Sequence, residues 1–181
     1  SLIKLLCGED IPYSGTVRVG SGLTVSLVAQ DTSRLRGKLS DLAQHSGIDE
    51  SLFLAMLAKL DVPKSQMEKD MSSLSAGQKK KVLIAKSICE PAHLHIWDEP
   101  MNYIDVISRM QIENLLLEYT PTILFVEHDK TFCDKVNRYM ADEEPYNGET
   151  QIYHYLELLR DVVGYDKAFC ENVATKIIDL R

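Results

Sequence analysis

The spacing of apolar and polar positions along the chain predicts alternating helices and short strands. Apolar residues that recur every three or four positions indicate one face of a helix, and short runs rich in Val, Ile and Leu indicate strands. By this criterion the predicted helices cover residues 1–8, most of 31–71, 76–89 and 107–119. The predicted strands cover residues 16–19, 23–29, 94–97, 122–126 and 175–180. Helices that separate apolar strands are typical of an α/β fold, here a mostly parallel sheet flanked by helices.

Two of the predicted strands end in charged side chains. The strand at 94–97 runs directly into Asp98 and Glu99, and the next strand along the chain is followed by Glu127 and His128. Two adjacent carboxylates repel each other, and a protein core does not tolerate them unpaired. Ligands of parallel sheets bind beyond the carboxyl ends of the strands, and a carboxylate there can hold Mg²⁺ that bridges nucleotide phosphates. The sequence therefore predicts a phosphate site at these strand ends.

The composition is that of an ordinary globular protein and argues against several classes. The 181 residues suffice for one domain with a core and are short for two. A formal net charge of -7 argues against a surface that binds nucleic acid by charge alone. No apolar run approaches the roughly 20 residues that span a bilayer, and Ser1 opens no signal-peptide pattern. The four cysteines fit no metal spacing and are expected to be reduced thiols, so we expect a cytoplasmic protein.

Five short segments follow one another in a defined order along the chain. They are LVAQD (27–31), LSAGQ (74–78), HIWDEP (95–100), MNYID (101–105) and VEHDK (126–130). In this order they resemble the Q-loop, the signature motif, the Walker B strand with its catalytic glutamate, the D-loop and the H-switch of ABC-type ATPases. The sequence of residues 75–113 most resembles the soluble ABC-F group, especially its antibiotic-resistance members that protect the ribosome from lincosamides and streptogramins. Those proteins carry two nucleotide domains in one chain, and this chain is most similar to the second.

The resemblance implies a role for each motif residue. In the family, two domains close around two ATP molecules, and the signature helix of one domain receives the γ-phosphate of the ATP held by the other. The free N–H groups and the positive dipole end of such a helix suit a phosphate. By resemblance, Asp98 holds Mg²⁺ through water, Glu99 activates the attacking water and His128 contacts the γ-phosphate. The implied nucleotide-binding residues are Gln30, Ser75, Ala76, Gly77, Gln78 and Asp105, and Gln30 also senses the metal.

Two features depart from the family pattern. Ala76 stands where the family has a glycine, which adds a methyl group where backbone and phosphate approach closely. The phosphate-binding loop Gly-x-x-x-x-Gly-Lys-[Ser/Thr] occurs nowhere in the chain, because the only Gly-Lys pair, Gly37-Lys38, is followed by Leu39. Residues 1–8 resemble the helix that follows such a loop, so we expect a domain cut just downstream of it. Without the loop, we expect this chain alone neither to hold nor to hydrolyse ATP.

The resemblance also implies how the domain is organised. Residues 1–181 are expected to form one truncated nucleotide-binding domain, with an N-terminal antiparallel β part and a helical subdomain at 31–90 that carries the signature motif. Near the end, DKTFCDKV (129–136) recurs as DKAFCENV (166–173). Residues 137–173 are therefore expected to be an insertion or a duplication of the H-switch segment, and a chimera would produce the same repeat.

Three functions remain open from the sequence. The first is ATP binding and hydrolysis by half of an ATP sandwich, with a second ABC nucleotide-binding domain (in the same full chain or in a homodimer) and the ribosome as partners. The second is a non-catalytic ABC-like interaction module. The third is the ATP-binding subunit of a membrane ABC transporter, which would dock through the region between Gln30 and Leu74. Lys79, Lys80 and Lys81 are expected to form a solvated basic face.

Overall fold

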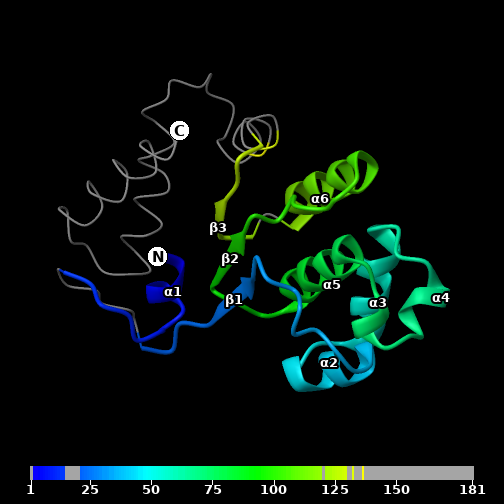
Figure 1. Cartoon of the computed structure of the whole chain (residues 1–181), viewed down its shortest axis with the longest axis horizontal. Coiled ribbons are helices and arrows are strands. Elements are labelled where there is room, and N and C mark those ends of the chain that lie inside the picture. The colour runs from blue at the N-terminus through cyan, green and yellow to red at the C-terminus, as the bar shows by residue number, and fades with distance from the viewer. Residues whose placement is uncertain (1, 15–20, 120, 130–131, 133–135, 137–181) are drawn as a thin grey trace. The chain divides into compact units, whose positions relative to one another are not determined.

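The computed structural model describes residues 2–14, 21–119, 121–129, 132 and 136 (Figure 1). They belong to two parts, one up to residue 23 and one from residue 24 to 136, and each is described by itself. In the first part, helix α1 spans Leu2–Leu6, within the helix expected at residues 1–8. Several expected features lie outside the described residues: the strands at 16–19 and 175–180, the antiparallel β part, the second copy of the repeat and the segment 137–173.

The second part is built on a three-stranded sheet. Its strands are β1 (Val25–Val28), β2 (Leu94–Asp98) and β3 (Ile123–Val126), hydrogen-bonded in that order. Both pairings are parallel, so the mostly parallel sheet expected from the sequence is confirmed. The first four residues of the central strand β2 are buried, which explains why apolar side chains occur on both of its faces rather than on one.

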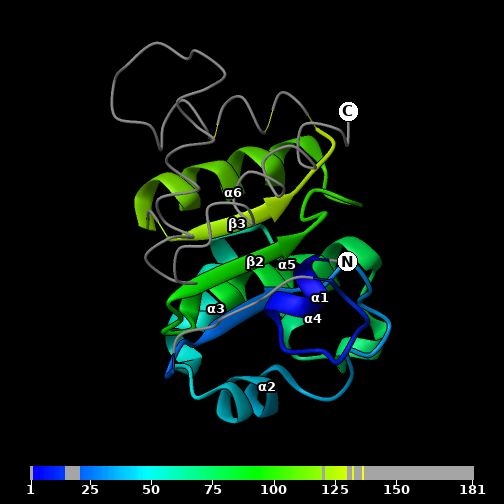
Figure 2. The same cartoon turned by 90° about the vertical axis from the view of Figure 1, so that its left-hand side faces the viewer.

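Helices follow and connect the strands. They are α2 (Leu39–Ser46), α3 (Glu50–Lys59), α4 (Lys64–Met67), α5 (Ala76–Cys89) and α6 (Val106–Tyr119), with a 3₁₀ turn at Met71–Ser73. Helix α5 packs on β1, α3 packs on α5, and α2 packs on α3. Figures 1 and 2 show α5 and α6 on the same side of the sheet. Among the described residues, no helix has the length and apolar character needed to cross a membrane.

The segment after β1 differs from its predicted structure. The sequence predicts a mostly helical stretch over residues 31–71, but the first helix there begins only at Leu39. Gly37 lies in the left-handed region with φ +87°, and its N–H donates to Asp70 Oδ2 at 3.1 Å. Asp70 also caps the 3₁₀ turn through Ser72 N at 2.8 Å. The segment is therefore held by side-chain caps and a glycine turn instead of by helical hydrogen bonds.

The core gathers where α5 meets the sheet. The fully buried large side chains include Trp97 and Ile96 of β2, Ile84 of α5 and Phe53 of α3. Successive side chains of a strand point to opposite faces, so His95 and Trp97 lie on the face opposite to Ile96. Both His95 and Trp97 contact Ser87 of α5, which identifies the face that α5 covers. This packing fixes α5 against the sheet and thereby places the helix start relative to the strand ends.

Candidate functional site

Polar side chains meet where β1 and β2 end. In the sheet register Val28 lies opposite Trp97, so Gln30 and Glu99 each stand two residues beyond a paired position. The amide Nε2 of Gln30 donates to Glu99 Oε2 at 2.7 Å. The structure therefore brings together two residues that lie 69 positions apart in the chain. Both were expected at this place from the sequence.

Glu99 adopts an uncommon backbone conformation. Its φ is +47°, in the left-handed region that a residue with a side chain rarely adopts. Its N–H donates to Val126 O of β3 at 2.8 Å, and its carboxylate accepts from Asn102 Nδ2. Strained backbone of this kind costs on the order of 1–3 kcal/mol and is kept only where the surroundings hold it. The turn after β2, and not strand alternation, thus sets the direction of the Glu99 side chain.

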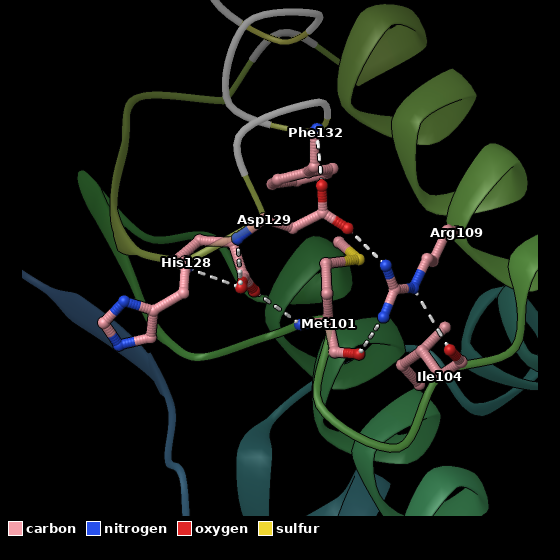
Figure 3. A network of polar contacts seen from close by, with 7 residues as sticks. Met101, Ile104, Arg109, His128, Asp129 and Phe132 are labelled. Carbon is pink, nitrogen blue, oxygen red and sulfur yellow. Dashed lines mark hydrogen bonds and ion pairs between the residues drawn. The ribbon is translucent and has the colours of Figure 1, made fainter. Parts of the chain in front are cut away.

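His128 approaches the same carboxylate from the end of β3. Its Nε2 lies 3.6 Å from Glu99 Oε1, while 70% of the imidazole is exposed. The backbone behind it is fixed by Glu127, whose Oε1 accepts from His128 N at 2.7 Å and from Asp129 N at 3.1 Å. Figure 3 shows the ring directed away from the network formed around Asp129. The imidazole is therefore oriented by its backbone and is accessible to a ligand.

The electrostatics of the strand ends are dominated by carboxylates. Burial raises the pKa of Asp98 above its ordinary value; the charge of Glu99 raises it further, and Lys80 opposes both effects. A group whose ionised form is disfavoured by burial and by a like charge is stabilised when a cation arrives. The arrangement consequently favours a positively charged ligand beside Asp98.

The donor set fits Mg²⁺ held by a nucleotide. Among the described residues, no group of three or more His, Cys, Asp or Glu side chains gathers to hold a metal ion by itself. Mg²⁺ is usually bound through one or two carboxylates, with phosphate oxygens and waters completing its shell. Asp98, with Gln30 nearby, supplies that small number of protein oxygens. The residues thus suit Mg²⁺ with a phosphate ligand better than a metal enclosed by protein.

Helix α5 begins at the predicted signature motif. Ser75 Oγ accepts from Gln78 N at 3.2 Å, and Gln78 Oε1 accepts from Ser75 N at 3.0 Å, which is a capping box. The side chains of Ser75 and Gln78 are thus used to start the helix. In this first turn the N–H groups of Ala76 and Gly77 have no partner inside the helix, and the positive end of the helix dipole lies there.

The start of α5 touches the segment between β2 and α6. A Cβ placed on Gly77 would lie 2.4 Å from the carbonyl oxygen of Tyr103, a distance that real Cβ atoms do not adopt. The carboxylate of Asp105 accepts from Ser108 N at 2.9 Å and Ser108 Oγ at 2.7 Å, and it lies 3.4 Å from Lys81 Nζ. The hydrogen bonds from Ser108 and the charge of Lys81 hold the pKa of Asp105 well below its usual range. The predicted site residues therefore form two groups, one at the ends of the strands and one at the start of α5. Residues 101–105 connect the two groups.

Two of the three lysines that follow the signature glutamine do not belong to the solvated basic face expected from the sequence. Lys80 is 0% exposed and Lys81 is 7% exposed. Lys80 Nζ donates to backbone carbonyl oxygens, and Lys81 pairs with Asp105. The expectation was wrong because the charge of a lysine says nothing of carbonyl and carboxylate partners that the fold brings from distant segments.

Arg109 of α6 is a site residue that the motifs did not indicate. Its Nε donates to Ile104 O at 3.2 Å and its Nη2 to Met101 O at 3.3 Å, while Nη1 pairs with the carboxylate of Asp129 (Figure 3). Asp129 also accepts from Phe132 N at 3.2 Å. One guanidinium thus connects the segment after β2 with the segment after β3. The only sequence signal was a single arginine in a predicted helix, and such a signal has no specificity.

The comparisons with known proteins decide the family. Residues 1–102, more than half of the chain, match the family model described as ABC transporter. The chain belongs to the ABC transporter family. Its structure agrees, since the ABC domain described as the dimeric post-hydrolysis state of the ATP-binding cassette MJ0796 bound to ADP and Pi resembles it with a TM-score of 0.54. That alignment covers 62% of this chain and 56% of the cassette at 19% identity, and so supports the fold alone.

Two curated relatives show which ABC proteins this chain resembles in sequence. It is 30% identical over 148 residues to the ATP-binding protein Uup of Buchnera aphidicola subsp. Schizaphis graminum, covering 77% of this chain and 25% of Uup. It is 23% identical over 184 residues to the energy-dependent translational throttle protein EttA of Haemophilus influenzae, covering 97% of this chain and 33% of EttA. The chain spans about a quarter of the length of the first curated relatives it matches.

Proposed function

We propose that this ABC domain binds and hydrolyses ATP as one half of a head-to-tail sandwich with a second ABC nucleotide-binding domain. The observation that carries the proposal is the cluster of Gln30, Glu99 and His128 at the ends of three parallel strands. Gln30 and His128 both approach the carboxylate of Glu99. Beside it, Asp98 has a pKa raised by burial, which favours a cation. A carboxylate surrounded in this way can accept a proton from a water molecule.

Each residue has a distinct task in this proposal. Glu99 accepts the proton of the attacking water, Gln30 and Asn102 keep its carboxylate in place, and His128 contacts the γ-phosphate. Asp98 and Gln30 hold Mg²⁺, which when bound offsets the negative charge of the phosphates. The start of α5 offers its amides to the γ-phosphate of the nucleotide held by the opposite domain. The residues proposed to touch nucleotide are Gln30, Ser75, Ala76, Gly77, Gln78 and Asp105.

The proposed setting of this chemistry is the ribosome. The name of EttA describes a translational throttle that depends on energy, and 97% of the present chain aligns with 33% of that protein. The sequence of residues 75–113 resembles that of the ABC-F resistance proteins. The proposed role is therefore protection of cytoplasmic ribosomes from antibiotics such as lincosamides and streptogramins. The proposal assigns this role to the complete protein, of which this chain supplies one nucleotide domain.

Hydrolysis by the complete protein tests the proposal. We expect Mg²⁺-dependent release of inorganic phosphate from ATP that rises when purified ribosomes are added. Cell-free translation inhibited by a lincosamide should recover on addition of the protein and ATP. Phosphate release without any response to ribosomes would favour the transporter subunit, and absence of hydrolysis would favour the non-catalytic module. The first result would overturn the proposed role at the ribosome, and the second would overturn the proposed ATP hydrolysis.

A further inference from the structure

Lys80 combines deep burial with a position next to the candidate site. It lies in the second turn of α5, and its side chain is 0% exposed. Charged side chains are almost never fully buried unless they are paired. The mechanism proposed above gives this residue no task, so its burial calls for a separate physical explanation.

The ammonium group of Lys80 bonds to backbone at two strand ends. Its Nζ donates to the carbonyl oxygens of Ala29 at 2.8 Å, Gln30 at 3.3 Å and Asp98 at 3.4 Å. A lysine ammonium has three N–H donors, which equals the number of these acceptors. Ala29 and Gln30 lie beyond the last paired residue of β1, where the sheet no longer supplies hydrogen bonds to the backbone. Lys80 supplies those bonds instead.

We propose that Lys80 is a positioning residue for ATP hydrolysis, which fixes the backbone that carries Gln30 and Asp98 to the start of the signature helix. The proposal rests on the function proposed above. Lys80 bonds to Gln30, whose side-chain amide bonds to Glu99. It also bonds to Asp98, which precedes Glu99 in the chain. Displacement of α5 when phosphate is bound at its start is then transmitted to both strand ends.

The contacts distinguish this role from simple packing. A buried apolar side chain of the same length would fill the space but would leave three carbonyl oxygens without this donor. A carbonyl oxygen that loses its donor in a part-buried place keeps its desolvation penalty, and the backbone relaxes to avoid that penalty. Burial lowers the pKa of Lys80, whereas the charges of Asp98, Glu99 and Glu127 act in the opposite direction. The three hydrogen bonds, and not the filled volume alone, therefore distinguish Lys80 from an apolar side chain.

The test compares three variants of the complete protein. Lys80→Met removes the donor and keeps the length of the side chain. Lys79→Met removes the same charge from the neighbouring, partly exposed position, and Val82→Ala removes packing from a fully buried position on the same helix. We expect Lys80→Met to lower kcat at least tenfold while the KM for ATP stays within about threefold, and both controls to keep kcat within about twofold. Lys80→Gln, which keeps one amide donor, is measured beside them and should lie between Lys80→Met and the parent.

Hydrogen exchange provides a readout that needs no turnover. Amide exchange of peptides covering residues 29–31 and 98–102 should be about tenfold faster in Lys80→Met than in Lys79→Met, with Lys80→Gln between the two. Equal exchange in Lys80→Met and Lys79→Met, or a loss of kcat in Lys80→Met no greater than that of Val82→Ala at similar thermal stability, would overturn the proposal. A parent protein without ATPase activity would overturn the proposed function, whereas the exchange result would still decide whether Lys80 fixes the strand ends.

Discussion

Polar side chains occur at two places on the same elements β1, β2 and α5, and the two places differ in how their charges are balanced. In the interior, Ser87 Oγ accepts from Trp97 Nε1 at 3.0 Å and lies 2.9 Å from Ser26 Oγ. Ser26 donates to Glu90, whose other oxygen pairs with Lys86 at 2.5 Å. Each charge in this interior network has an opposite partner.

The strand ends present the opposite case. The charges of Asp98, Glu99 and Glu127 all act on the buried ammonium of Lys80. The adjacent carboxylates of Asp98 and Glu99 outnumber the ammonium of Lys80, which leaves an excess of negative charge beside the exposed side chain of His128. Polar groups that satisfy one another hold a fold together, whereas a cluster with unbalanced charge is suited to a ligand that completes it. The balance of charge thus distinguishes the interior network, which stabilises the fold, from the candidate site, which is suited to a ligand.

The largest expected effect comes from the carboxylate at the centre of the cluster. Glu99→Gln keeps the shape of the side chain but removes the proton acceptor, so we expect kcat of the complete protein to fall by roughly 10²–10⁴-fold. The matched control is Glu118→Gln, which alters an exposed carboxylate paired with Lys59 and should leave kcat unchanged. Steady-state phosphate release measures both. Turnover of Glu99→Gln equal to that of the parent would show that another group activates the water.

His128 should follow with a smaller loss. His128→Ala removes the imidazole that faces Glu99 and the proposed γ-phosphate, and we expect kcat to fall by about 10²-fold, the lower end of the effect of one acid–base group. Tyr165 occupies the equivalent place in the second copy of the repeat, and a phenol cannot replace an imidazole there. Tyr165→Ala should therefore leave kcat unchanged. Equal losses from both variants would mean that the second copy also reaches the nucleotide.

Removing the centre of the interior network should affect stability and leave catalysis intact. Ser87→Ala takes the acceptor away from Trp97 Nε1, and we expect a loss of about 1–3 kcal/mol in the free energy of unfolding. Urea denaturation measures this loss, with Ser51→Ala at an exposed position as the control. We expect kcat to remain within about twofold of the parent under conditions where the variant is folded. A tenfold loss of kcat would show that the two polar places are not independent.

Asp105 should give the smallest effect, one that depends on pH. Asp105→Ala removes the cap that accepts from Ser108 N and Oγ, so we expect a loss of about 1 kcal/mol in unfolding free energy at pH 7. The pKa of Asp105 is depressed in the folded state, so its contribution is complete above the unfolded pKa of about 3.9 and declines as the pH falls below that value. Urea denaturation at pH 7 and pH 3 should therefore show a smaller difference between the parent and Asp105→Ala at pH 3. An equal difference at both values would contradict a charge-dependent cap.

The parallel strands and the helices α5 and α6 could be predicted from the sequence because their patterns are local. An apolar run, a serine cap and a 3.6-residue periodicity each act within a few positions of the chain. The convergence of Gln30, Glu99 and His128 was also expected, through the order of the motifs. The burial of Lys80 could not be predicted, because its carbonyl acceptors at residues 29, 30 and 98 meet only once the strands have paired. The same holds for Arg109, whose partners belong to two different loops.

The central claim is that the excess negative charge at the strand ends is completed by Mg²⁺ and ATP, with Asp98 holding the metal and Glu99 acting only in hydrolysis. Isothermal titration of the complete protein with ATP, with and without Mg²⁺, tests this division directly. The account predicts that Glu99→Gln binds Mg-ATP within about threefold of the parent, and that Asp98→Asn binds it at least tenfold more weakly, a difference of about 1.4 kcal/mol or more. Without Mg²⁺, the two variants should bind ATP alike. Equal affinities of Asp98→Asn and Glu99→Gln for Mg-ATP would contradict the account.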